Sequence, residues 1–129
     1  MNDQVSLTPP EWYLMEVLWE NSPLYGREIV SALEQRAGWS RSTTLTVLKR
    51  LTDKGCVACD DSGKINRFSP LIDRRLAVRR ETDSFLDRVY RGSVGMMMSA
   101  VVKEQTLSRQ EIDELYAILD EAAKRQGGE

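Results

Sequence analysis

The segment from Gly38 to Gly55, GWSRSTTLTVLKRLTDKG, constrains the fold of this chain more than any other stretch. Apolar side chains recur in it at helical spacing, and a glycine stands at each end. Directly after Gly55 the apolar pattern changes to the short alternating period of strands. We therefore predict a helix that is capped by Ser40 or Ser42, stops at Gly55 and is followed by a β-hairpin.

This helix has two unlike faces. One is an apolar seam, expected to be buried, made of Thr44, Val47, Leu48 and Leu51. The other face has hydroxyls and cations but no acids, and it carries Ser42, Thr43, Thr46, Lys49 and Arg50. By helical spacing, Leu45 lies on this exposed side as well. A solvated surface is the more common explanation of such a face, so its role depends on the surrounding elements.

Two helices precede this one. The first starts at a capping sequence, Thr8 to Glu11, and places Trp12, Met15, Leu18 and Trp19 at helical spacing. The second, REIVSALEQRAG, ends at Gly38, and a short extended piece, LYG, lies before it. The hairpin CVACD-DSGK-INRFSP comes last. Three helices followed by a hairpin is the winged helix-turn-helix order, so we predict a DNA-binding domain over residues 1–70.

From residue 71 onward the pattern is helical throughout, which makes the expected fold class mostly α. Three helices are predicted, in IDRRLAVRRETDSFLDRVYRG, SVGMMMSAVVKEQ and LSRQEIDELYAILDEAAKRQ. They form only a thin core by themselves, so their apolar faces are expected to meet a second copy of the chain. We predict a helical dimerisation domain over 71–129, with contacts from Phe85, Leu86, Val89, Tyr90, Met97, Val101, Ile112, Leu115, Tyr116 and Leu119.

Basic residues gather around the two-faced helix. The chain has a formal net charge of −2, yet residues 36–67 hold seven bases against three acids. A local basic surface favours phosphate binding whatever the total charge. The hydroxyls of the exposed face suit base edges, and Leu45 suits a thymine methyl group. The expected phosphate contacts are Arg41, Lys49, Lys54, Lys64 and Arg67, with Arg50 also near the backbone.

Several other function classes are disfavoured. The chain has no histidine and no glycine-rich phosphate loop, which argues against an enzyme, and we expect no cofactor. No apolar run approaches the roughly 18 residues of a membrane span, and the N-terminus lacks the regions of a signal peptide. A cytoplasmic protein without a membrane partner is therefore expected. A winged helix that contacts only proteins is a further possibility, which the basic zone disfavours.

Cys56 and Cys59 form a CxxC pair, which suggests an alternative function. They could make the chain a thiol- or metal-responsive regulator whose DNA affinity switches. Residues three apart in a strand point to opposite faces, however, and neither a second cysteine pair nor a histidine completes four zinc ligands. We therefore expect no metal site within the chain, and the thiol switch stays an alternative.

The chain resembles the BlaI/MecI/CopY penicillinase-repressor family of bacterial regulators. The resemblance rests on EWYLMEVLW, REIVSAL, WSRSTTLTVLKRLTDKG, RFSPLI and FLDRVYRG…EIDELYAIL, and it covers about residues 7–123. It implies a homodimeric repressor that binds a palindromic operator with TACA and TGTA half-sites. It also implies base-reading contacts from Ser42, Thr43, Leu45, Thr46 and Arg50. Leu45 stands where the family often has Lys or Arg, and Thr44 where an aliphatic residue is usual.

The resemblance also bears on the inducing signal. Antibiotic-resistance members are cleaved at an Asn-Phe bond after activation of a membrane sensor-protease, and the matching pair here is Ala100-Val101. A sensor-protease is therefore a candidate partner, with Ala100 and Val101 as the candidate cleavage position. Copper-responsive members carry a cysteine-rich tail, which AAKRQGGE does not match. The sequence thus predicts the repressor body without either known signal input.

Overall fold

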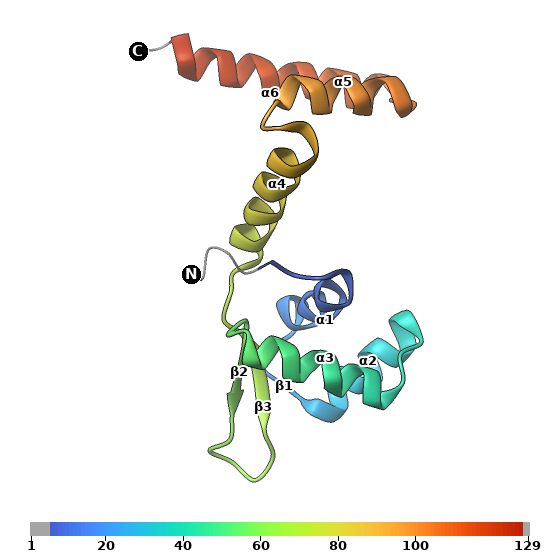
Figure 1. Ribbon diagram of the computed structural model, residues 1–129, viewed down its shortest axis with the longest axis vertical. Helices are drawn as coiled ribbons and strands as arrows, with labels where there is room; N and C mark the ends of the chain where they lie inside the picture. Colours follow the sequence, from blue (N-terminus) through green and yellow to red (C-terminus); the bar gives the residue numbers. More distant parts are fainter. Residues whose placement is uncertain (1–5, 128–129) are drawn as a thin grey trace. The chain divides into compact units, whose positions relative to one another are not determined.

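The elements of the chain follow one another as three helices with a short strand among them, a hairpin and three further helices (Figure 1). A computed structural model describes residues 6–127. The elements are α1 (Pro9–Glu20), β1 (Leu24–Tyr25), α2 (Gly26–Ala37), α3 (Arg41–Asp53), β2 (Val57–Asp60), β3 (Arg67–Pro70), α4 (Arg74–Tyr90), α5 (Val94–Glu104) and α6 (Arg109–Gly127). The mostly α fold and the order of elements predicted from the sequence are confirmed.

The chain divides into two compact units, residues 1–84 and 85–129, which are described separately. The division falls within α4. The boundary of the DNA-binding and dimerisation domains after residue 70 stays a prediction, because a division by contacts does not test which segment binds DNA. Within residues 6–127, no helix is both long enough and apolar enough to cross a membrane.

Local capping sets the ends of the first helices. The Thr8 hydroxyl accepts from the Glu11 N–H at 3.4 Å, and the Glu11 carboxylate accepts from the Thr8 N–H at 2.9 Å, so the predicted capping box is formed. Gly38 adopts a left-handed conformation, φ 68°, that ends α2. Ser40, not Ser42, is the N-cap of α3, since its hydroxyl accepts from the Thr43 N–H at 3.2 Å.

The sheet has three strands in the order β1-β3-β2, and both pairings are antiparallel. In the wing, formed by β2, β3 and the loop between them, Cys59 lies opposite Phe68. β1 adds Leu24 on the other side of Phe68, so the start of α2 is joined to the wing. The sequence predicted β1 only as an extended piece and extended β3 back to Ile65, which lies in the wing loop instead.

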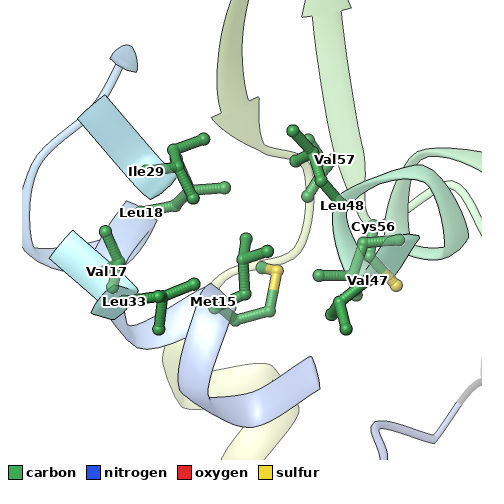
Figure 2. Packing of buried hydrophobic residues seen from close by; sticks show 11 residues of the cluster. Met15, Val17, Leu18, Ile29, Leu33, Val47, Leu48, Cys56 and Val57 are labelled. Atoms are coloured by element: carbon green, nitrogen blue, oxygen red, sulfur yellow. The ribbon is translucent and has the colours of Figure 1, made fainter. Parts of the chain in front are cut away.

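The core of the first unit lies between α1, α2, α3 and β2 (Figure 2). Its buried side chains are Leu14, Met15, Val17, Leu18, Ile29, Leu33, Val47, Leu48, Leu51, Cys56 and Val57. Trp12 and Trp19 share the helical spacing of the buried Met15 and Leu18 but are only half-buried, in an edge-to-face contact with centroids 5.5 Å apart. The Trp19 ring N–H donates to the Ile72 carbonyl at 2.9 Å, which keeps this side chain at the edge of the core.

Thr44 carries an isolated polar group in this core. Its side chain is fully buried, and its hydroxyl has no hydrogen-bond partner among the residues that the structure describes. Valine has nearly the same shape without the hydroxyl. We expect Thr44→Val to raise the free energy of unfolding by about 1 kcal/mol, because an unsatisfied buried hydroxyl is removed. Urea denaturation measures this change.

Thr46→Val is the matched control for this prediction, because Thr46 is exposed on the same helix. Its stability is expected to stay within about 0.5 kcal/mol of the wild-type value. A lower stability of Thr44→Val would mean that the buried hydroxyl makes a hydrogen bond in solution, and the prediction would be wrong.

The second unit begins with the last residues of α4. Left-handed Arg91 and Gly92, φ 52° and 83°, end that helix where the sequence predicted a break. Ser93 caps α5, and at the start of α6 the pair Ser108 and Glu111 exchanges two hydrogen bonds, of 2.9 and 3.1 Å. None of the side chains of α5 or α6 is buried. The single chain therefore gives this unit no closed core.

Candidate nucleic-acid interface

The exposed face of α3 is built as the sequence predicted. The four seam residues Thr44, Val47, Leu48 and Leu51 are buried, whereas Ser42, Thr43, Leu45, Thr46, Lys49 and Arg50 are exposed. Leu45 has 38% of its surface exposed and does not belong to the core cluster. Because the seam anchors α3 on the core, this face is held at the surface in a fixed orientation. We call these six exposed residues the α3 face.

Hydroxyl groups of the α3 face differ in how far they are already engaged. Ser40 donates to the Thr43 hydroxyl at 3.0 Å and lies 3.3 Å from the Ser42 hydroxyl, so these groups form a small network at the helix start. The Thr46 hydroxyl, one turn further on, has no hydrogen-bond partner among the described residues. It is therefore available as both donor and acceptor.

The cations of the region fall into two groups. Arg41, Arg50 and Lys64 form no ion pair within residues 6–127. Lys49 lies 3.1 Å from Asp53, and Arg67 lies 3.4 Å from Asp60, in ion pairs that are exposed to solvent. Exposed pairs of this kind contribute little, so both cations remain able to exchange partners.

Lys54, a predicted phosphate contact, is engaged inside the protein. Its ammonium group donates to the Glu11 carboxylate at 2.6 Å and to the Ser6 carbonyl at 2.7 Å. Glu11 has only 2% of its surface exposed. Burial by itself raises the pKa of Glu11, but the hydrogen bond from Lys54, bonds from Thr8 and the Lys54 charge outweigh it and lower the pKa below 4.5. The structure thus places Lys54 in a structural ion pair.

A cleft of about 440 Å³ lies between α3, the wing and the start of α2. It is lined by Gly26, Arg27, Arg41, Leu45, Lys64, Ile65, Asn66 and Phe68. The structure brings the predicted residues Arg41, Leu45 and Lys64 together here, and it adds Arg27, which the sequence analysis missed. Arg27 is the one base in residues 1–35 and lies in the first turn of α2, and these two features could have identified it as a site residue.

In the second unit, an apolar groove of about 830 Å³ runs between α5 and α6. Four predicted dimer contacts line it, namely Ile112, Leu115, Tyr116 and Leu119. On the α5 side the groove is lined by Val94, Met98 and Val102, which were not among the predicted contacts. The predicted residues of α5, Met97 and Val101, do not line it. Of the other predicted contacts, Phe85 and Val89 are exposed, whereas Leu86 and Tyr90 are half-buried.

The two cysteines lie in different environments. Cys56 belongs to the buried core, as Figure 2 shows, whereas Cys59 is exposed. Burial raises the pKa of the Cys56 thiol, since desolvation disfavours the thiolate. In the part of the chain that the structure describes, no three or more Cys, Asp or Glu residues are grouped so that they could hold a metal ion. This arrangement gives the alternative of a thiol or metal switch little support.

Comparison with known proteins gives matches along most of the chain. The family model described as Penicillinase repressor matches residues 7–121. The penicillinase repressor of Bacillus licheniformis is 32% identical over 119 residues, which cover 92% of this chain and 93% of that protein. The methicillin resistance regulatory protein MecI of Staphylococcus aureus is 25% identical over 119 residues, covering 92% and 97%.

A solved structure matches part of the chain. It is the monomeric form of Bacillus licheniformis BlaI in complex with the blaP half-operator. The match has a TM-score of 0.51 and 28% identity, and it covers 56% of this chain and 88% of that chain.

Proposed function

The chain belongs to the penicillinase repressor family, and from this membership we propose that it is a DNA-binding transcriptional repressor of the BlaI/MecI type. The observation that carries the proposal is the α3 face, which combines exposed hydroxyls and cations, with Asp53 as an acid at the end of the helix in an exposed pair with Lys49. The helix is fixed by four buried residues on its other side, so the face keeps one orientation. Such a helix fits the major groove of B-DNA, where hydroxyl and guanidinium groups bond base edges.

Base reading is assigned to Ser42, Thr43, Leu45, Thr46 and Arg50. Thr46 and Arg50 lie one helical turn apart, and neither side chain makes a hydrogen bond or ion pair within the described residues. Ser42 and Thr43 stand in the first turn of α3, and Leu45 offers an apolar contact for a thymine methyl group.

Phosphate binding is assigned to Arg41, Lys49, Lys64 and Arg67. Arg41 and Lys64 have no acidic partner among the described residues, and the ion pairs of Lys49 and Arg67 are exposed and weak. Lys54 is left out of this set. If the Lys54 ammonium group bound a phosphate instead, the buried carboxylate of Glu11 would lose its main partner. Breaking this pair costs more free energy than breaking an exposed ion pair.

Homodimerisation is the second part of the proposal. The apolar groove of the second unit is lined in part by the exposed Tyr116, Ile118 and Leu119, so this unit presents an apolar face. Such faces on a soluble chain mark interaction sites, and a second copy supplies the same face in return. A dimer matches a palindromic operator, because its two α3 helices then read two equal half-sites.

The operator is tested by fluorescence anisotropy on a TACA/TGTA palindrome and on a scrambled duplex of equal length, over a series of salt concentrations. We expect tight binding of two chains to the palindrome and weaker binding to the scrambled duplex, with both affinities falling as salt rises. Equal weak binding to both would contradict this operator. Binding that does not depend on salt would contradict a DNA-phosphate interface.

Induction by proteolysis stays a prediction. The candidate bond between Ala100 and Val101 lies inside α5, where helical hydrogen bonds engage the backbone. A sensor-protease partner would therefore need α5 to open locally before cleavage, because proteases cut exposed and extended segments more readily than helices.

A further inference from the structure

The lining of the cleft between α2, α3 and the wing combines positive charges with apolar side chains. Arg27, Arg41 and Lys64 reach it from three different elements, and no acidic residue lines it. Leu45 and Ile65, 38% and 53% exposed, supply the apolar part. Gly26, the first residue of α2, also lines the cleft, so the positive end of that helix dipole adds to its potential.

Arg27 is held at this cleft without being neutralised. Its guanidinium carbon lies 4.8 Å from the centroid of the Tyr25 ring, a cation–π contact that orients the group. It makes no ion pair within residues 6–127. Arg36, at the other end of the same helix, is instead bonded to the carboxylate of Glu20, at 3.1 Å for one of its two bonds. Of the two arginines of α2, Arg27 is therefore the one without an acidic partner among residues 6–127.

We propose that this cleft binds one sugar–phosphate strand of the DNA duplex, with Arg27 as a phosphate-binding residue. The inference rests on the proposed function and extends it from α3 and the wing to the first turn of α2. Three cations beside apolar side chains complement a strand that alternates charged phosphates with the less polar faces of deoxyribose. Arg41 and Leu45 belong to α3 as well as to the cleft, so a duplex whose groove receives α3 brings its backbone to the cleft.

A contact to phosphate has a defined signature. It contributes equally to every duplex, because the backbone is the same in all sequences. It also releases condensed counterions, so each phosphate contact adds about 0.9 to the slope of log affinity against log salt. Loss of the Arg27 contact should therefore lower that slope by about 0.9 for each chain bound, with the same change on specific and random DNA.

The test measures the affinities of the full chain for the palindrome and the scrambled duplex between 50 and 200 mM salt. We expect Arg27→Gln to weaken both complexes, with a penalty that is larger at the lower salt concentration than at the higher one, by about threefold for one bound chain and about twelvefold for two. Arg27→Lys keeps the charge and should keep the wild-type slope. Arg36→Gln is the matched control, since it removes the same charge from the same helix outside the cleft, and its slope should equal that of the wild type.

Asn66→Asp provides an independent variant, because it places a carboxylate in the lining of the cleft. It should weaken binding to both duplexes, whereas Gln110→Glu on α6 should not. Thermal unfolding checks that each variant remains folded, which is expected because these side chains are exposed.

Several results would overturn the inference. A wild-type slope for Arg27→Gln would remove Arg27 from the interface, while salt-sensitive binding of the wild type would leave the proposed function standing. Equal slope changes in Arg27→Gln and Arg36→Gln would assign the effect to total charge. A loss in Arg27→Lys as large as in Arg27→Gln would assign it to packing. If the wild type bound neither duplex at any salt concentration, the proposed function would fail together with this inference.

Discussion

Replacing Lys54 with methionine is expected to lower the free energy of unfolding by about 2–3 kcal/mol, because it leaves the buried Glu11 carboxylate without its cation. The Lys54 side chain remains 31% exposed, so the loss is smaller than the roughly 3–5 kcal/mol of a fully buried pair. Urea denaturation at pH 7 measures the change. Lys49→Met is the control, since it breaks an exposed ion pair of the same helix and should cost below about 1 kcal/mol.

A second substitution separates the charge from packing. Glu11→Gln in the Lys54→Met background removes the buried charge while keeping an oxygen that accepts from the Thr8 N–H. This double variant should recover part of the lost stability. If it is less stable than Lys54→Met alone, the buried charge is not the cause of the loss.

The effect of Lys54→Met should depend on pH in a defined direction. In the wild type the pKa of Glu11 lies below its usual value of 4.5, so the ion pair stabilises the fold above that pH and this stabilisation is lost as pH falls through the folded-state pKa. Without Lys54, its hydrogen bond and its charge no longer lower the pKa of Glu11, so we expect that pKa to rise. The stability difference between the two proteins should therefore be largest near pH 7 and shrink in acid. A constant difference down to pH 3 would contradict this mechanism.

Thr46→Ala is expected to weaken binding to the operator by about 1–3 kcal/mol and binding to scrambled DNA hardly at all. The reason is that Thr46 presents a hydroxyl without a partner in the described chain, at the middle of the α3 face, where base edges are reached. Fluorescence anisotropy on both duplexes at one salt concentration gives the two losses. Their difference measures the contribution to base reading.

Thr52→Ala is the matched control, because the Thr52 hydroxyl already donates to the Leu48 carbonyl at 2.8 Å. Its binding to both duplexes should stay close to that of the wild type. Equal losses on the two duplexes for Thr46→Ala would remove Thr46 from the base-reading set. Arg50→Ala then shows whether Arg50 contacts phosphates or bases. Loss of a phosphate contact would weaken both complexes, whereas loss of a base contact would weaken the operator complex selectively.

Features that depend on near neighbours in the chain were predictable. The capping box of Thr8 and Glu11 and the helix end at Gly38 follow from residues that lie within a few positions of each other. The two faces of α3 follow from helical spacing alone. The sequence could not decide between Ser40 and Ser42 as the cap of α3, because both are good caps and the choice depends on where the chain leaves the turn after Gly38.

Features that depend on distant segments were not predictable. The ion pair between Lys54 and Glu11 joins residues 43 positions apart, and it gives a structural role to a residue whose surroundings in the sequence favour phosphate binding. The cleft is a similar case, because the pairing of β1 with β3 brings the first turn of α2 to the wing. In the second unit, the sequence predicted the apolar side of α6, but the packing of α5 presents Val94, Met98 and Val102 to the groove.

By itself the sequence determined the identity and order of the helices, the hairpin and the two faces of α3. These depend on backbone hydrogen bonds and side-chain periodicity within about one helical turn or one hairpin. Only the tertiary structure decided which cations remain without a partner. An ion pair forms where folding brings opposite charges within a few ångströms, and that distance is set by packing of segments far apart in the chain, as Lys54 and Arg27 illustrate.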